Sequence, residues 1–545
     1  MYWTSARSLV HTLGVQRLKM SGEPKHPLAL RTCLCGSSQS WVERLTRFLA
    51  RYGPTVCLLL ISVLPLWTAW QHNTHLNDDT YITLTYAKNL AAGHGFVYNH
   101  PPPTQGTTTP LFAVLVAVIG ALLPSIDLSA VAVYLTALCW IGIGWTFYAF
   151  RGTWNITIPQ VLVISLVVVS HGWIAFLGME SYVFAFLLVL TFSLWYSGQH
   201  LAAGVTAGLL FLTRGEGALV AVLLGVRLAV RAIRFAGNRP TIGRFLPLAR
   251  LCLGFALPVS VWFGYAFVTF GSLLPNTLAA KRAQGHGMTF AFLRRLIAEW
   301  IPTWGMRFKL GGLSLAPFWW FLILVGFVTL VVKRRRWLIF VAWILLYVLG
   351  YTLLQVSPYW WYQLPIHFVA QILVSWGLVT ILKLVHQITS DSSGVRRKIP
   401  LAFAVIATAL VFLRPFVDVV LKYEGDSRAE SYLALCSWIR ENTQSTDSIG
   451  YVEVGYLGYY TPNRIIDLLG LVLPDVVPYV VAEDIQGAFW QYMPDYYLYS
   501  PGFDWLLSEI NENPEFAREY ESVAVLPGAH GSEIAVFKRV EVQNE

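Results

Sequence analysis

Long apolar runs separated by short polar segments dominate the first 420 residues of the chain. A transmembrane helix requires about 20 consecutive, mainly apolar residues. Eleven stretches approach that length: 53–70, 108–124, 129–150, 156–172, 175–197, 200–232, 249–270, 313–332, 337–355, 363–383 and 400–420. The stretch 200–232, which Arg214-Gly215-Glu216-Gly217 interrupts, is long enough for a kinked span or a short hairpin, and we count it as one crossing because that keeps every basic loop on one side. The pattern predicts a polytopic α-helical membrane protein with about eleven transmembrane helices.

The last 125 residues follow a different pattern, which is that of a small α/β domain. Helical spacing of apolar residues predicts helices over 427–442 and 503–513. Strand-like runs follow a shorter period. The segments that hold these runs are 448–460, 464–472, 520–527 and 533–540. We therefore expect a C-terminal soluble domain over residues 421–545.

Composition and charge support this division. The chain is 56% hydrophobic and 13% charged, whereas soluble domains carry about 25% charged residues. Residues 1–420 hold 10 acidic against 32 basic residues, and residues 421–545 hold 20 against 7. The positive charge lies in a leader and in short loops between apolar runs. A nucleic-acid partner is therefore excluded as the explanation of the basic balance.

Basic loops decide the expected orientation, because Lys and Arg in short loops stay in the cytoplasm. The leader 1–52 and the segments 227–250, 333–336 and 396–398 are basic. Loops 71–107, 271–312 and 356–363 then face outward, with the C-terminal domain. We expect a protein of the plasma (inner) membrane with a cytoplasmic N-terminus and a periplasmic or extracellular C-terminal domain. Residues 53–312 would form a catalytic module and 313–420 auxiliary spans.

Asp78 and Asp79 stand side by side directly after the first apolar run. One interpretation is helix capping, with Asn77 or Asp78 accepting hydrogen bonds from a helix that begins near Thr80. The other is a general base that faces a lipid-borne substrate, because ionised groups at a membrane boundary are rare unless they are used. The next residues predict a short helix, a break at Gly93-His94-Gly95 and an extended segment 96–99. The loop is therefore structured.

Several motifs occur in a fixed order and together resemble a known superfamily. They are DD.YI…YAKNLA.GHGFVYN followed by Pro110-Leu111, GMES (178–181), LTRGEG (212–217), FGSLLPNTLAAK (270–281) and YVEVGYLGYYTPNRIIDLLGLV (451–472). The set resembles the GT-C superfamily of polytopic glycosyltransferases and is closest to mycobacterial-type terminal arabinofuranosyltransferases. Gly215 departs from the pattern, because proline is commoner there in related chains.

The resemblance implies an inverting transfer of a sugar from a polyprenyl-phosphate donor. The donor sugar would be a pentose such as arabinofuranose, or a hexose. The acceptor would be an envelope glycan, a glycolipid or a protein on the outer face. A first-loop aspartate, Asp78 or Asp79, would deprotonate the acceptor hydroxyl.

The leaving phosphate requires cations, and the outward loop 271–312 supplies them. It carries six basic residues, Lys281, Arg282, Arg294, Arg295, Arg307 and Lys309, against the single acid Glu299. Lys281, with Arg282, is the preferred phosphate ligand. Arg294 and Arg295 lie in an amphipathic stretch that also suits anchoring to lipid headgroups.

Other polar residues are candidates for substrate contacts, each with a structural alternative. Arg214 could bind the phosphate, or form a buried ion pair with Glu216 that fixes a kink. Glu180 suits a polar cavity or a helix end.

Three further candidates lie later in the chain. The aromatic segment 357–368, with Tyr362 and His367, fits an interfacial belt or a sugar-stacking surface. Glu453 and Asp467 could contact the acceptor or belong to turns.

We expect no obligatory cofactor or metal. The Cys33–Cys35 pair has no matching pair of zinc ligands, and the first-loop histidines lack a metal-ligand spacing. A weak divalent site at Asp78 or Asp79 stays open. The alternatives to an enzyme are a flippase or transporter of lipid-linked sugars, and a non-catalytic envelope-assembly protein. Repeated halves with broken helices, which typify transporters, are not evident.

Overall fold

The computed structural model describes residues 36–99, 103–170, 172–234, 242–285, 289–306, 309–310, 313–390 and 398–540. The chain divides into two compact units, residues 1–53 and 54–545, and nearly all described residues belong to the second. Cys33 and Cys35 lie outside the described residues, as does most of the predicted leader. The side chains of Arg307 and Lys309 also lie outside them.

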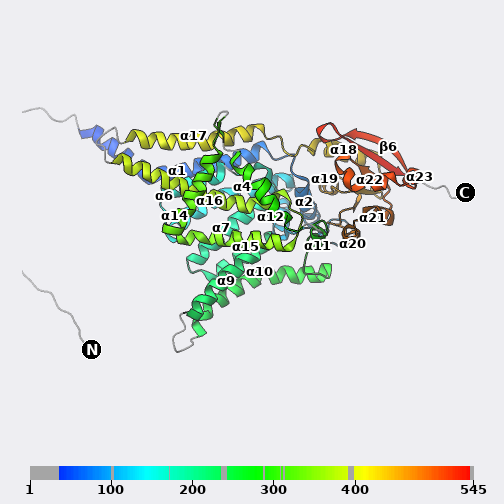
Figure 1. Cartoon of the computed structure of the whole chain (residues 1–545), viewed down its shortest axis with the longest axis horizontal. Helices are drawn as coiled ribbons and strands as arrows, with labels where there is room; N and C mark the ends of the chain where they lie inside the picture. Colours follow the sequence, from blue (N-terminus) through cyan, green and yellow to red (C-terminus); the bar gives the residue numbers. More distant parts are fainter. Residues whose placement is uncertain are drawn as a thin grey trace, which may run out of the picture. The chain divides into compact units, whose positions relative to one another are not determined.

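Long helices make up most of the described chain (Figure 1). They are α1 (Gly36–Gln71), α4 (Leu128–Ala149), α6 (Ile158–Ser170), α7 (Ser181–Tyr196), α8 (His200–Thr213), α9 (Gly217–Arg234), α10 (Leu246–Phe270), α14 (Ala316–Lys333), α15 (Leu338–Leu354), α16 (Leu364–Ser390) and α17 (Lys398–Lys422). Among the described residues, six helices are long and apolar enough to cross a membrane. They are Tyr52–Gln71, Leu128–Ala149, Gly243–Phe270, Ala316–Lys333, Arg335–Leu354 and Trp360–Ile388.

Shorter elements connect these helices. They are α2 (Asp78–Ala91), α3 (Pro110–Leu122), α5 (Arg151–Trp154), α11 (Asn276–Ala283), α12 (Ala291–Arg295), the π-helical turn η3 (Leu296–Trp300), α13 (Ile301–Met306), and the two-residue strands β1 (Lys309–Leu310) and β2 (Leu313–Ser314). As predicted, α2 is a helix that ends before Gly93 and Gly95, which both have positive φ. The amphipathic stretch 291–304 is also helical, with Phe292, Leu296 and Trp300 on its buried face.

Two of the predicted spans differ from the structure. The stretch 108–124 yields only the 13 residues of α3, a length of about 20 Å. Thr109, at its start, lies beside Thr83 of α2 (3.4 Å). Just after its end, the Ser129 hydroxyl donates to the Asn73 carbonyl oxygen (3.5 Å). Both ends of α3 therefore lie beside the segment 71–107, and this placement, rather than its length, distinguishes α3 from α6, which also has 13 residues.

The stretch 200–232, for which the sequence allowed a kinked span or a short hairpin, is a hairpin of α8 and α9 broken at residues 214–216. The Trp195 ring lies 6.4 Å from the His200 ring at the start of α8. The Arg227 guanidinium of α9 lies 5.0 Å from the same Trp195 ring. The two helices therefore return to the same end of α7.

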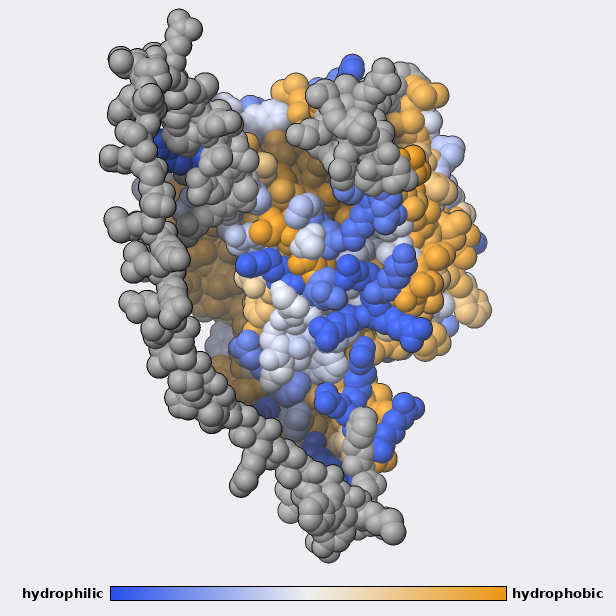
Figure 2. All heavy atoms as spheres, turned by 90° about the vertical axis from the view of Figure 1, so that its left-hand side faces the viewer, coloured by the Kyte–Doolittle hydropathy of each residue, from blue (hydrophilic) through white to orange (hydrophobic). Residues whose placement is uncertain are grey.

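The helix ends form two groups. At one end the Arg334 and Arg336 guanidiniums donate to the carbonyl oxygens of Asn155 (2.5 Å) and Thr153 (2.6 Å), and Thr153 lies 2.9 Å from the Ser197 hydroxyl. Hydrophilic side chains gather on this face, flanked by hydrophobic ones (Figure 2). The connections that follow α4, α7 and α14 therefore meet at a basic end.

The opposite end adjoins the C-terminal domain (Figure 1). Its elements are α18 (Ala429–Asn442), β3 (Ser448–Tyr451), α19 (Gly455–Tyr460), β4 (Arg464–Asp467), α20 (Val477–Val481), α21 (Ile485–Tyr492), β5 (Tyr496–Tyr499), α22 (Asp504–Glu512), α23 (Phe516–Glu519), β6 (Tyr520–Pro527) and β7 (Glu533–Arg539). The sheet order is β4-β3-β5-β7-β6. Strands β4, β3 and β5 are parallel, whereas β7 runs antiparallel to β5 and to β6.

The predicted helices are confirmed as α18 and α22, and each of the four segments predicted to hold a strand contains one, β3, β4, β6 or β7. The second part of the segment 448–460, residues 455–460, forms the helix α19. Strand β5 was not predicted. Its Tyr496 and Tyr497 are buried, so the polar-looking tyrosine run belongs to the core of the domain.

Close contact between α8 and α10 depends on glycines. A Cβ on Gly254 of α10 would lie 2.2 Å from the Leu201 carbonyl oxygen and 3.0 Å from the Gly204 Cα. A Cβ on Gly264, ten residues further along the same helix, would meet no atom within 4 Å. Small residues at helix interfaces allow this close backbone approach.

We expect Gly254→Ala to lower the unfolding temperature of the purified full-length protein in detergent, because the added methyl group forces α8 and α10 apart. The matched control is Gly264→Ala. It should leave the temperature unchanged or raise it, since alanine favours a helix over glycine by about 1 kcal/mol. Equal losses in both variants would contradict the proposed packing.

Candidate functional site

The two adjacent aspartates at the start of α2, Asp78 and Asp79, have different surroundings. Asn77, not Asp78, caps this helix, because the Asp79 backbone N–H donates to Asn77 Oδ1 (3.1 Å). The sequence alone did not decide whether Asn77 or Asp78 would be the capping residue. With the cap supplied by Asn77, both aspartate carboxylates are available for other partners.

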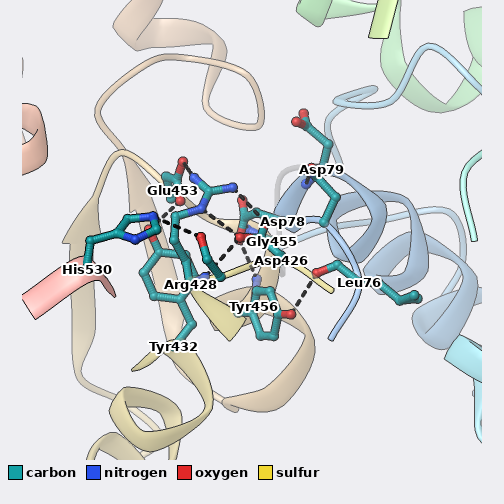
Figure 3. A network of polar contacts seen from close by, with 12 residues as sticks. Leu76, Asp78, Asp79, Asp426, Arg428, Tyr432, Glu453, Gly455, Tyr456 and His530 are labelled. Carbon is teal, nitrogen blue, oxygen red and sulfur yellow. Dashed lines mark hydrogen bonds and ion pairs between the residues drawn. The ribbon is translucent and has the colours of Figure 1, made fainter. Parts of the chain in front are cut away.

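Asp78 binds the C-terminal domain (Figure 3). Its Oδ2 accepts the Gly455 N–H (3.0 Å) and its Oδ1 accepts the Tyr456 N–H (2.9 Å), at the start of α19. The Tyr456 hydroxyl donates in return to the Leu76 carbonyl oxygen (2.7 Å). A Cβ on Gly455 would lie 1.9 Å from the Asp78 carbonyl oxygen, so only glycine fits there. Asp78 is buried and caps a helix that lies almost 380 residues away in sequence.

Asp79 points away from this network (Figure 3) and lines a cavity. Among the described residues, no side chain or backbone group makes a hydrogen bond or ion pair with its carboxylate. Burial raises the pKa of this carboxyl, and the positive charges of Lys281 and Arg428 partly oppose that rise. Asp79 is therefore the member of the pair that faces open space.

The cavity has a volume of about 410 Å³. Its walls come from α2, the loop 105–109, the α8–α9 tip, the end of α10, α11, α15 and the segment 356–362. The cavity brings together five of the predicted residues, Asp79, Glu180, Arg214, Lys281 and Tyr362. Apolar side chains of α8, of the end of α10 and of the segment that follows it line another part of the cavity; they include Phe211, Trp262 and Leu274. Leu274 is 58% exposed, so this part reaches the apolar surface.

Lys281 lies within a set of three aromatic rings. Its ammonium lies 5.4 Å from the Tyr359 ring centroid, 5.4 Å from that of Trp361 and 5.9 Å from that of Tyr362. Such rings attract a cation through their electron-rich faces. None of the described carboxylates forms an ion pair with Lys281. Trp361 and Tyr362 are buried, so these rings face a cation rather than forming the interfacial belt considered above.

Arg214 is paired on two sides. Its guanidinium contacts Glu180 Oε1 (2.8 Å) and Glu216 Oε1 (2.9 Å). Glu216 Oε1 also accepts the Tyr351 hydroxyl (2.7 Å). The predicted Arg214–Glu216 pair is confirmed, and Glu180 extends it. The two glutamates offset the charge of Arg214, which makes it a tie for the α8–α9 tip rather than an uncommitted cation for phosphate.

The other predicted residues lie outside the cavity. Arg282 is exposed on α11. His367 is 2% exposed; its Nδ1 accepts the Trp173 indole N–H (3.2 Å) and its ring packs near Trp304 and Trp319. These positions do not fit the phosphate role expected for Arg282 or the substrate contact expected for His367.

Glu453 and Asp467 also have structural partners. Glu453 pairs with Arg428 and accepts the Tyr432 hydroxyl (Figure 3), and burial raises its pKa. Asp467 is fully buried and accepts the Leu469 N–H (2.9 Å) and the Val472 N–H (2.8 Å). Burial raises the pKa of Asp467 to about 6. Glu453 is therefore held by side chains of α18 and of the residue before it, whereas Asp467 shapes the loop that brings Leu471 to the cavity wall.

The sequence analysis missed the polar residues that line the cavity near Asp79. They are Thr83, Gln105, Thr107, Thr108, Thr109 and Thr277. The available signal was the segment TQGTTTP at 104–110, which directly precedes the Pro110-Leu111 motif. Within the described part of the chain, no group of three or more His, Cys, Asp or Glu side chains is arranged to hold a metal ion.

Comparison with known families covers only the C-terminal domain. A family model described as a domain of unknown function (DUF8728) matches residues 422–541. No curated protein matches the chain. The match includes Gly455 and Tyr456, which bind Asp78, and Leu471, which lines the cavity.

Asp78→Asn should lower the free energy of unfolding at pH 7 by about 1–3 kcal/mol. An amide has a single acceptor oxygen, so one buried N–H of Gly455 or Tyr456 is left unpaired. Thermal unfolding of the full chain in detergent measures the loss. Asp79→Asn is the matched control and should show no such loss. Equal destabilisation of the two variants would contradict the separate roles of these neighbours.

The raised pKa of Asp79 gives a pH-dependent expectation. A carboxyl whose pKa is higher in the folded than in the unfolded chain loses stability as pH rises from its ordinary value, near 3.8, through the folded value. Asn at this position does not titrate. The unfolding temperature of Asp79→Asn minus that of wild type should therefore be larger at pH 7 than at pH 4. A constant or smaller difference at pH 7 would rule out an ionisation penalty at Asp79.

Proposed function

We propose that this protein is a membrane glycosyltransferase of the GT-C type. It transfers a pentose or hexose from a polyprenyl-phosphate donor to a hydroxyl of an envelope glycan, glycolipid or protein on the outer face of the membrane. The observation that carries the proposal is that one cavity contains both the Asp79 carboxylate and the Lys281 ammonium, which aromatic rings enclose.

Asp79 suits the acceptor hydroxyl, and Lys281 suits the leaving phosphate. Asp79 accepts the proton of the acceptor hydroxyl, whose oxygen attacks the anomeric carbon of the donor sugar. The bond from that carbon to the phosphate oxygen breaks, and polyprenyl phosphate leaves with the electron pair. Lys281 stabilises the negative charge that develops there, as a fixed cation does in a site shielded from water. The partial burial that raises the pKa of Asp79 also makes it a stronger base.

The apolar part of the cavity suits a lipid-linked donor. Phe211, Trp262 and Leu274 line it where α8 and α10 meet the apolar surface. A polyprenyl chain can therefore remain among apolar groups while its phosphate reaches Lys281. A water-soluble nucleotide sugar would place no apolar group in this region.

The helix ends support eleven crossings, with a different membership from that predicted. The helices α1, α4, α6 to α10 and α14 to α17 alternate between the basic end and the end that carries the C-terminal domain. Helix α3 is removed from the predicted set, and α8 and α9 count separately. Arg334 and Arg336 then lie in the cytoplasm, while the cavity and the C-terminal domain face outward.

A transporter of lipid-linked sugars is the second candidate, and the position of the charges disfavours it. Alternating access places the binding site near the bilayer midplane. Asp79 and Lys281 instead lie at the end that adjoins the C-terminal domain, where Leu471 of that domain closes the cavity wall.

Asp79→Asn should reduce sugar transfer by about 10²–10⁴-fold, the typical contribution of a general base. It should leave donor binding nearly unchanged, because the amide keeps the shape of the site. Transfer from a radiolabelled polyprenyl-phosphate sugar to membrane acceptors measures the rate. Full activity of Asp79→Asn would remove Asp79 as the base, and a transport signal without acceptor would favour the transporter.

Lys281→Met should weaken binding of polyprenyl phosphate, because methionine keeps the length of the side chain and removes its charge. The control is Arg282→Met, the next residue of α11, which is exposed and lies outside the cavity. Binding can be followed by quenching of tryptophan fluorescence, since Trp262 and Trp361 line the site. Equal affinities of the two variants would exclude Lys281 as the phosphate ligand.

A further inference from the structure

The loop 104–109 is a rigid wall of the cavity. The Tyr86 hydroxyl donates to the Thr104 carbonyl oxygen (2.6 Å) and accepts the Gly106 N–H (2.7 Å). A Cβ on Gly106 would lie 2.6 Å from that hydroxyl and 2.7 Å from Val472 Cγ1. The loop is therefore held between α2 and the C-terminal domain, with glycine required at 106.

The polar groups on this wall are uncharged. The hydroxyls of Thr83, Thr107 and Thr109 lie 3.0–3.4 Å from one another, and all three residues line the cavity. Hydroxyl and amide groups can each bind a ligand hydroxyl without a charged partner. The nearest charged groups of the lining are Asp79, four residues before Thr83 on α2, and Lys281 on α11.

Two side-chain atoms of the cavity have no hydrogen-bond partner among the described residues. They are Gln105 Oε1 and Thr277 Oγ1. The two residues are only 4% and 5% exposed, and both line the cavity. Buried polar atoms are nearly always paired, because leaving one unpaired is costly. A ligand that supplies O–H groups would satisfy both atoms.

Thr277 places this wall next to the phosphate end of the site. Thr277 and Lys281 are four residues apart on α11, so their side chains lie on one face of that helix. Asn276 holds the start of α11 against the loop, because its backbone N–H donates to the Gln105 carbonyl oxygen (3.0 Å). A group attached directly to a phosphate at Lys281 would therefore meet Thr277 and Gln105 first.

We propose that Gln105, Thr277 and the threonines of the loop form the subsite for an uncharged sugar ring of the lipid-linked donor. Gln105 Oε1 accepts a hydrogen bond from one sugar hydroxyl, and the Thr277 hydroxyl bonds to another. The residues of this subsite carry hydroxyl and amide groups, which match the hydroxyls of an uncharged sugar. The inference rests on the proposed function and specifies its donor.

The test separates the sugar from its lipid carrier. Purified full-length protein is titrated with polyprenyl phosphate and with the same lipid carrying arabinofuranose or, in a second arm, mannose. Thr277→Val and Gln105→Leu should each weaken binding of at least one sugar-bearing lipid by about 3- to 10-fold, the range for one lost hydrogen bond. Binding of bare polyprenyl phosphate should not change.

Two control variants show whether a loss is specific. Thr277→Ser keeps the hydroxyl and should bind as wild type does. Thr80→Val makes the same isosteric change at another buried threonine whose hydroxyl has no hydrogen-bond partner among the described residues, but Thr80 does not line the cavity. It should bind both kinds of lipid as wild type does. Unfolding temperatures confirm that each variant is folded.

The outcomes distinguish the two proposals. If wild type binds the sugar-bearing lipids and both cavity variants bind them equally well, the subsite is wrong and the proposed function stands. Equal losses for the bare and sugar-bearing lipids would overturn the subsite as well, because the wall would then act on the phosphate or on the fold. If wild type binds neither kind of lipid, the proposed function fails and the subsite fails with it.

Discussion

The hydrogen bonds from the start of α19 to Asp78 determine the arrangement of the candidate site. They fix the rotation of α2, because both carboxylate oxygens are held by backbone N–H groups of the C-terminal domain. Successive residues of a helix point about 100° apart. Holding Asp78 against α19 therefore turns Asp79 toward the cavity. Gly455 makes this possible, since no side chain fits between its backbone and α2.

The two cationic side chains that line the cavity, Arg214 and Lys281, have different partners. Arg214 is bound by Glu180 and Glu216, so its charge stabilises the tip of a helix hairpin. Lys281 is enclosed by aromatic rings, which stabilise a cation without neutralising it. An anion that enters the cavity therefore meets its uncompensated positive charge at Lys281. The sequence placed both residues in one phosphate site, and only their neighbours separate the roles.

Local patterns were sufficient to predict the elements whose signal lies in neighbouring residues. The long apolar helices, the amphipathic helices α18 and α22 and the strands β6 and β7 are of this kind. The choice between Asp78 and Asp79 was not predictable, because Gly455 lies far along the chain. The aromatic partners of Lys281 are likewise distant in sequence. The ion pair between Arg214 and Glu216 was predictable because the two residues are close in sequence, whereas the ion pair with Glu180 was not.

The sequence pattern left the arrangement of two apolar stretches, 108–124 and 200–232, undecided for one physical reason. Hydropathy reports how apolar a stretch is, but not whether lipid or protein covers it. Helix α3 is apolar because its side chains Phe112, Val116 and Ala117 are buried against other helices. The stretch 200–232 has a charged turn between two apolar helices. Arg214 in that turn lies inside the protein, where Glu180 and Glu216 neutralise its charge. Among the described residues, six helices are long and apolar enough to cross a membrane, and hydropathy alone does not decide what covers the shorter apolar helices.

The C-terminal domain is part of the cavity rather than an attachment to it. Asp467 organises the loop 468–472 through two backbone N–H groups. That loop accepts the Asn276 side-chain N–H at the Gly470 carbonyl oxygen (2.6 Å) and places Leu471 on the cavity wall. The same domain holds Asp78. Its contacts therefore fix the two helices, α2 and α11, that bring Asp79 and Lys281 to the cavity.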